Sequence, residues 1–219
     1  MSSFTTSLFD SEWIPASRGA CEPKVMIVLH GYGDSLKGFR AIKEELRLPG
    51  MNYLLLNGPR RHGSGFSWCA LHPKEGAPSL IKTRARLFAL VRELLSAGWA
   101  SRDLFWLGHS QGAMIASDLV LHHPKPFGAL IGVSGCLWLE KNWKRKALRS
   151  GAGETPWLMT HGTRDRIIRP EEIRLSLEEL IRGPVRVDYQ EFPKGHDFDF
   201  DHEVPFIRRW VKEVRESAR

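Results

Sequence analysis

The amino-acid sequence predicts an α/β fold, a mostly parallel β-sheet flanked by helices on both faces. Short apolar runs of strand length recur along the chain, and stretches with apolar residues at helical spacing separate them. Several of these runs are apolar throughout, as expected of strands that are covered on both faces. The chain has 219 residues, 42% of them hydrophobic, and it shows no internal repeat or linker. We therefore expect residues 1–219 to form a single domain.

The predicted strands are recognised by their apolar composition and by the turn residues that flank them. The last of them alternates apolar and polar residues, which is typical of an edge strand with one face partly exposed to solvent. In chain order the predicted strands are 4–9 at an edge, 25–29, 53–56, 104–107, 128–134, 156–160 and 185–192. Residues 15–23 are predicted to form a loop.

The predicted helices carry apolar residues three and four positions apart, and several begin at a residue that favours a helix start. Asp34 or Ser35 caps the first helix, Ser79 caps the second, and Pro170 begins the fourth. In chain order the predicted helices are 36–48, 79–97, 113–121, 170–182 and 202–217. Two long irregular regions remain, 58–78 and 136–155, the second expected to be partly helical. Loops of this length are more often functional than idle.

Composition and charge exclude several classes of protein. No apolar stretch is long enough to span a membrane, and the N-terminus lacks the pattern of a signal peptide. Three scattered cysteines without a CxxC pair suit reduced thiols, so we expect a cytoplasmic protein without stable membrane anchoring. The net charge is +7, but the basic residues are dispersed and form no nucleic-acid motif. We therefore interpret them as a solvated basic face and expect no nucleic-acid partner.

The segment Gly108-His109-Ser110-Gln111-Gly112 follows an apolar strand and leads into a helix of small residues. Strand, tight turn, serine and helix is the context of a GxSxG nucleophile elbow. The two glycines let the strand and the helix approach closely around the serine. The bare pattern is short enough to arise by chance, so its interpretation depends on what the other strand ends supply.

Polar residues follow three other predicted strands at the same edge of the sheet. They are the loop His30-Gly31-Tyr32-Gly33, Asp165 and His196. Active sites of parallel sheets form beyond the carboxyl ends of the strands, so we expect these segments to meet Ser110. A serine hydroxyl needs a base, which we assign to His196, and the base needs an orienting carboxylate, which we assign to Asp165. Asp188, Asp197 and Asp199 are poorer candidates, because the first lies inside a strand and the others are too close to His196.

An ester-cleaving serine also needs hydrogen-bond donors for the developing oxyanion. The backbone N–H of Gln111, the residue after the nucleophile, is one candidate, and the N–H of Tyr32 in the glycine-rich loop is the second. Trp68 and Trp138, in the two irregular regions, are candidates for contact with the substrate. His109 lies beside the nucleophile, and we expect its side chain to point away from the site. His30 and His161 are expected to make structural hydrogen bonds near it.

The sequence resembles the carboxylesterase/phospholipase family of α/β-hydrolases, which includes acyl-protein thioesterases. The resemblance covers about residues 25–196 and rests on four stretches in the family's order, His30-Gly-Tyr-Gly-Asp34, Gly108-His-Ser-Gln-Gly112, His161-Gly-Thr-Arg-Asp165 and Gly195-His196. It implies a minimal α/β-hydrolase with little lid and no cofactor. It also implies that an acyl-enzyme forms from a small-molecule ester. His109 and Tyr32 depart from residues common in the family's thioesterases, so the acyl chain and leaving group are not specified.

Three alternatives stand beside this interpretation. An acyl-protein thioesterase or lysophospholipase, acting on acylated protein or lysophospholipid, is the nearest. A catalytically idle fold that serves as a basic binding module is less favoured, because it would have no reason to keep serine, histidine and aspartate together. The acidic and imidazole groups between His196 and His202 suggest a metal, but no spaced ligand motif supports one, so we expect no metal site. For the favoured serine esterase, we expect substrates with short or medium acyl chains.

Overall fold

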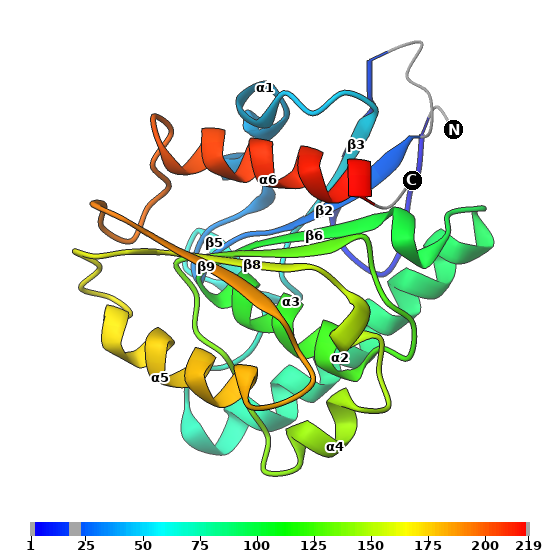
Figure 1. Ribbon diagram of the computed structural model, residues 1–219. Coiled ribbons are helices and arrows are strands. Elements are labelled where there is room, and N and C mark those ends of the chain that lie inside the picture. Colours follow the sequence, from blue (N-terminus) through cyan, green and yellow to red (C-terminus); the bar gives the residue numbers. More distant parts are fainter. Residues whose placement is uncertain (1–2, 18–22, 218–219) are drawn as a thin grey trace.

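A computed structural model describes residues 3–17 and 23–217 of the chain (Figure 1). Its strands form a seven-stranded sheet in the order β1-β3-β2-β6-β7-β8-β9 and a separate two-stranded hairpin, β4-β5. All neighbours in the large sheet are parallel except β1, which runs antiparallel to β3. The strands are β1 Ser11–Ile14, β2 Lys24–Leu29, β3 Met51–Leu56, β4 Arg60–His62, β5 Gly65–Ser67, β6 Leu104–His109, β7 Ala129–Val133, β8 Trp157–Gly162 and β9 Val187–Phe192.

Helices cover both faces of the sheet, so the predicted fold class is confirmed. The helices are α1 Ile42–Leu46, α2 Pro73–Ser96, α3 Gln111–His122, α4 Trp143–Ala147, α5 Pro170–Ile181 and α6 Glu203–Ser217. Helices α1 and α6 lie on one face, and α2 to α5 lie on the other (Figure 1). Strands β3, β7 and β8 are buried along their whole length, which explains why apolar and polar residues do not alternate in their sequences.

The N-terminal edge differs from the prediction. The described residues place the first strand at Ser11–Ile14, not at 4–9. Phe9 is buried in the core, whereas the residues of β1 are all half-buried. The apolar residues within 4–9 therefore indicate packing against the core and not a strand. The strand itself is defined by backbone pairing of β1 with β3, and a local sequence pattern does not reveal such pairing. Residues 18–22 of the predicted loop 15–23, with Cys21, lie outside the described residues.

Two predicted segments are organised differently in the structure. The predicted helix 36–48 is divided into a 3₁₀ turn, Leu36–Phe39, and the short helix α1. The predicted loop 58–78 contains the hairpin β4-β5 and the start of α2, whose N-cap is His72 and not Ser79. Strands of three residues are too short to show a period, so the hairpin had no sequence signal. Ser79 lies inside α2, where its hydroxyl donates to the carbonyl oxygen of Glu75.

The parallel arrangement brings the loops after β2, β6, β7, β8 and β9 to one edge of the sheet, called here the carboxyl edge. This is the edge at which parallel α/β sheets form their active sites. Among the described residues, none of the helices combines the length and the hydropathy needed to cross a bilayer. Cys69 and Cys136 are free thiols.

Candidate active site

Ser110 lies at the carboxyl end of β6, in the sharp turn that leads into α3. Its φ of 53° and ψ of −117° put a non-glycine residue in strained backbone geometry, as a nucleophile elbow requires. A Cβ on Gly112 would come within 2.2 Å of the carbonyl oxygen of Leu29, so only glycine allows α3 to start this close to β2. The N–H of Ser110 donates to the carbonyl oxygen of Val133 at 2.9 Å, which ties the turn to β7.

The structure brings Ser110, His196 and Asp165 into direct contact, although they are far apart in the sequence. Ser110 Oγ lies 2.9 Å from His196 Nε2, and His196 Nδ1 lies 2.8 Å from Asp165 Oδ2. The carboxylate accepts hydrogen bonds, so Nδ1 carries the proton and Nε2 is free to accept one from the serine hydroxyl. This is the relay of nucleophile, base and orienting acid that serine hydrolysis uses.

Asp165 is held in its ionised form. Burial opposes the charge, but hydrogen bonds from His196 and from the amides of Ile168 and Ile167 outweigh it and lower the pKa of the carboxyl. The two amides donate to Oδ1, at 3.0 and 2.8 Å, and leave Oδ2 to face the imidazole. His161 stands beside it, with Nε2 donating to the carbonyl oxygen of Ile168 at 2.9 Å. The structural role expected of His161 is therefore observed.

The loop after β2 is held in place around Tyr32. His30 Nε2 accepts from the N–H of Gly58 at 3.0 Å, so Nδ1 carries the proton and donates to the carbonyl oxygen of Gly31 at 2.6 Å. Burial lowers the pKa of His30 and keeps the ring neutral, as this pattern requires. No acceptor for the N–H of Tyr32 occurs within the described part of the chain. The N–H of Gln111, at the start of α3, has no intrahelical acceptor either.

The two tryptophan candidates occupy different environments. Trp68 is completely buried, and its indole N–H donates to the carbonyl oxygen of His30 at 2.8 Å. It supports the loop of Tyr32 from the core and exposes no surface to a substrate. Trp138 lies in the segment that follows β7 at the carboxyl edge, and its side chain is 39% exposed. Of the two candidates, Trp138 is therefore the one with surface available for contact.

His109 does not point away from the site. Its ring lies 5.1 Å from the ring of His196, and Nε2–H donates to the carbonyl oxygen of His196 at 3.0 Å. Burial lowers the pKa of His109, so the imidazole is neutral at pH 7. Phe198 packs against its other side, with ring centroids 5.3 Å apart. His109 therefore supports the backbone of His196, and the hydrogen bond to Ser110 Oγ comes from His196.

The different roles of His196 and His109 can be distinguished by mutation. Replacing His196 with alanine removes the base and is expected to lower ester turnover by about a millionfold. His109→Ala removes only a hydrogen bond to the His196 backbone, and we expect a fall of about tenfold to hundredfold, typical of a small misplacement. Steady-state kinetics of both purified variants give the comparison. The reverse ranking would mean that His109 is the base.

A second group of ligand-type side chains lies between α2 and α3 and the segment before α4. Asp118, His122 and Glu140 place one ligand atom each within 4.8 Å of one another. The guanidinium of Arg84 is already among them, with Nη1 2.8 Å from Asp118 Oδ1 and 3.1 Å from Glu140 Oε1. Burial raises the pKa of Asp118 to about 7, against the opposing effect of Arg84. We interpret the group as a buried ion-pair network that holds the segment of Trp138 against the helices.

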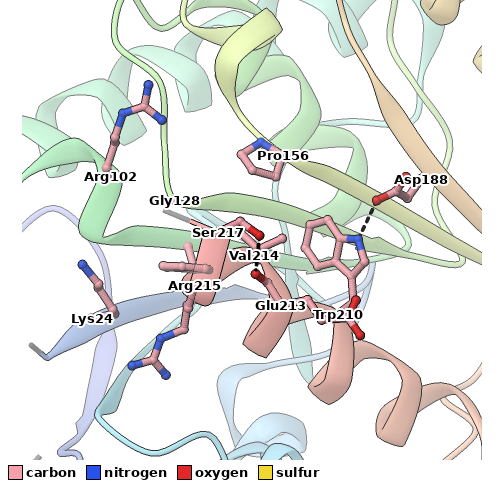
Figure 2. Close-up of a pocket in the computed structure, with 11 residues that line it drawn as sticks. Lys24, Arg102, Gly128, Pro156, Asp188, Trp210, Glu213, Val214, Arg215 and Ser217 are labelled. Atoms are coloured by element: carbon pink, nitrogen blue, oxygen red, sulfur yellow. Dashed lines mark hydrogen bonds between the residues drawn. The ribbon is translucent and has the colours of Figure 1, made fainter. Parts of the chain in front are cut away.

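A cavity of about 510 Å³ lies at the opposite edge of the sheet (Figure 2). It is bordered by Lys24, Gly128 and Pro156, which stand at the amino ends of β2, β7 and β8. One wall is Trp210, whose indole N–H donates to Asp188 at 2.6 Å. This contact gives Asp188 a structural role far from Ser110. The cavity is therefore separate from the candidate active site.

Comparison with known proteins identifies the family. The model of the phospholipase/carboxylesterase family matches residues 16–213. The chain belongs to this family. It is thus an α/β-hydrolase that hydrolyses carboxylic esters. Acyl-protein thioesterase 1 from Yarrowia lipolytica is 25% identical over 91% of this chain and 95% of its own length.

Two further similarities complete the comparison. A probable carboxylesterase from Oryza sativa is 27% identical over 61% of this chain, and the match spans only 57% of that protein. The crystal structure of esterase PE8 has a TM-score of 0.81 and 23% identity, covering 94% of this chain and 99% of that one. At this identity the structural similarity supports the α/β-hydrolase fold alone.

Proposed function

We propose that the protein is a serine hydrolase that cleaves carboxylic esters with short or medium acyl chains through an acyl-enzyme. The observation that carries the proposal is the unbroken contact from Ser110 Oγ to His196 at 2.9 Å and from His196 to Asp165 at 2.8 Å. His196 takes the hydroxyl proton as Ser110 attacks the ester carbonyl carbon. The same proton then passes to the departing alcohol as the carbon–oxygen bond breaks.

The second half of the reaction repeats these roles with water. His196 takes a proton from water, the resulting hydroxide attacks the acyl-enzyme, and the proton returns to Ser110 as the acid leaves. Asp165 keeps Nδ1 protonated and stabilises the imidazolium in both halves. The N–H groups of Tyr32 and Gln111 stabilise the oxyanion, since both are free to donate at the carboxyl edge.

The segments around Ser110 favour an open site. The hairpin β4-β5 is paired to the loop of Tyr32, with the N–H of Phe66 donating to the carbonyl oxygen of Asp34 at 2.8 Å. The segment that carries Trp138 is fixed by Glu140, which contacts Arg84 and Lys146. Both segments are thus anchored to their surroundings, and we expect neither to close over a long acyl chain.

A series of p-nitrophenyl esters from acetate to palmitate tests this proposal. We expect kcat/KM to be greatest for a short or medium chain and about tenfold lower for palmitate, the discrimination that a limited pocket exerts against hydrocarbon that it cannot bury. A rise that continues to long-chain triglyceride would contradict the open site. Absence of turnover on every ester would contradict the enzyme itself and favour a binding module.

A second candidate function is that of an acyl-protein thioesterase or lysophospholipase. It is favoured by the similarity to acyl-protein thioesterase 1 from Yarrowia lipolytica, which extends over nearly the whole of both chains. The triad chemistry is the same, and only the leaving group changes from an alcohol to a thiol or a glycerophosphate ester. Comparison of kcat/KM for a simple ester, an S-acylated peptide and a lysophospholipid distinguishes the candidates.

A further inference from the structure

Lys194 is a buried lysine in the loop that carries His196. The loop joins β9 to α6 and contains no helix or strand around Lys194 and His196. Individual contacts hold its backbone, among them the hydrogen bond from the N–H of Arg164 to the carbonyl oxygen of Lys194 at 3.0 Å. Lys194 is only 7% exposed, an unusual position for an ammonium group. It precedes His196 by two residues, and its side chain turns back into the protein beneath the loop.

The Lys194 ammonium has three partners. It donates hydrogen bonds to Ser134 Oγ at 2.8 Å and to the carbonyl oxygen of Asp197 at 3.0 Å. It also forms an ion pair with Glu203, with Nζ 2.8 Å from Oε2. Asp197 directly follows His196, and its carbonyl belongs to the peptide between Asp197 and Phe198. The ammonium therefore fixes the loop at the residue that follows the proposed base.

The partners of Lys194 connect the His196 loop to the nucleophile elbow. Ser134 follows Val133 at the end of β7, and the carbonyl oxygen of Val133 accepts from the N–H of Ser110. The ammonium thus connects the side chain of Ser134, the residue next to Val133, with the backbone carbonyl of Asp197, the residue next to His196. On the other side, Glu203 at the start of α6 also accepts from the N–H of Asp199, at 3.2 Å. The ion pair between Lys194 and Glu203 therefore joins the start of the loop, after β9, to its end, at α6.

Stability alone does not account for this ion pair. Burying two charges carries a desolvation penalty that their attraction offsets only in part, and apolar residues of similar volume are often equally stabilising. Glu203 is completely buried, and its Oε1 has no hydrogen-bond partner within the described residues. Two apolar side chains in place of Lys194 and Glu203 would not make the hydrogen bonds to Asp197 and Ser134.

We propose that Lys194, paired with Glu203, is a positioning residue that holds His196 Nε2 at bonding distance from Ser110 Oγ. This inference rests on the proposed triad. The base acts in both halves of the reaction, and a displacement of about 1 Å costs on the order of a hundredfold in rate. Lys194 is only 7% exposed, so its side chain has little surface for an ester to contact, and we expect the effect in kcat and not in KM.

Replacing Lys194 with methionine tests the proposal. Methionine fills much of the lysine volume without the donors, and we expect kcat to fall about a hundredfold while KM stays within about twofold. Active sites are counted with a fluorophosphonate probe carried to completion, and kcat is expressed per labelled site, so unfolded protein does not lower it. Lys24→Met is the matched control, because Lys24 is paired with Asp103 at 2.6 Å at the opposite edge. Its kcat should equal that of the wild type.

A double variant separates positioning from stability. Lys194→Met leaves Glu203 buried without its cation, and Lys194→Met combined with Glu203→Gln removes both charges while keeping an acceptor for Asp199. We expect the double variant to regain thermal stability but not kcat. Recovery of both, or a loss confined to KM, would overturn the proposal.

Two further measurements complete the test. If Lys194→Met does not fold, Ser134→Ala decides, since it removes one of the two hydrogen-bond acceptors of Lys194. A lower kcat at unchanged KM supports the positioning role, and a wild-type kcat overturns it. If the wild type neither labels nor turns over ester, the proposed function fails. Wild-type activity together with an unaffected Lys194→Met variant overturns this inference alone.

Discussion

Replacement of Ser110 with alanine is expected to abolish ester hydrolysis, with a fall in kcat of about a millionfold. The variant keeps the neighbouring amides but has no oxygen to attack the carbonyl, so no acyl-enzyme forms. A fluorophosphonate probe should label the wild type at Ser110 and leave the variant unlabelled, as read by intact-protein mass spectrometry. Ser110 is only 9% exposed, and among the described residues its hydroxyl is hydrogen-bonded to His196 alone. We therefore expect the variant to fold.

Ser117 provides a matched control for this experiment. It lies in α3, is completely buried, and its hydroxyl has no partner among the described residues. Ser117→Ala should label fully and retain wild-type turnover. Labelling of Ser110→Ala at another residue, with turnover preserved, would show that the nucleophile lies elsewhere.

Replacement of Asp165 with asparagine is expected to lower kcat about ten-thousandfold while the fold is retained. The amides of Ile167 and Ile168 require an acceptor, so the asparagine oxygen takes the place of Oδ1 and its NH₂ group faces His196. An NH₂ group cannot accept from Nδ1–H. The imidazole then carries its proton on Nε2, where it cannot accept the proton of Ser110.

The kinetics and thermal stability of Asp165→Asn should be measured beside those of Asp188→Asn. Asp188 accepts the indole N–H of Trp210 at the remote cavity, and asparagine can accept the same bond (Figure 2). The control should keep its turnover. Equal activity of the two variants would show that Asp165 does not orient the base.

The candidate triad was predictable because parallel strands order the site. Each of Ser110, Asp165 and His196 follows a strand, and parallel strands present their carboxyl ends at one edge. An apolar run followed by a polar residue is a local pattern in the sequence. The fold class then predicts where that polar residue lies, because the ends of parallel strands share one edge of the sheet. The same reasoning identified the loop of Tyr32 at this edge.

Other features had no local pattern. The hairpin β4-β5 has strands of three residues, too short for a period to appear. Trp68 reads as a loop residue in the sequence, but the hairpin carries it into the core beneath His30. Lys194 reads as an ordinary surface lysine, because its partners Ser134 and Glu203 are distant in the chain.

Residue composition and spacing predict the α/β class, the order of the main strands and helices, and the residues that lie at the carboxyl edge. These features depend on the composition of short segments and on the spacing of apolar residues within them, and both can be observed in the sequence. The contacts between segments become visible in the folded chain alone. Folding placed the ring of His109 against His196, Trp68 in the core and the Lys194 ammonium beneath the His196 loop. Hydrogen bonds and ion pairs act over a few ångströms between groups from different segments, so they depend on the packed chain and not on any one stretch of it.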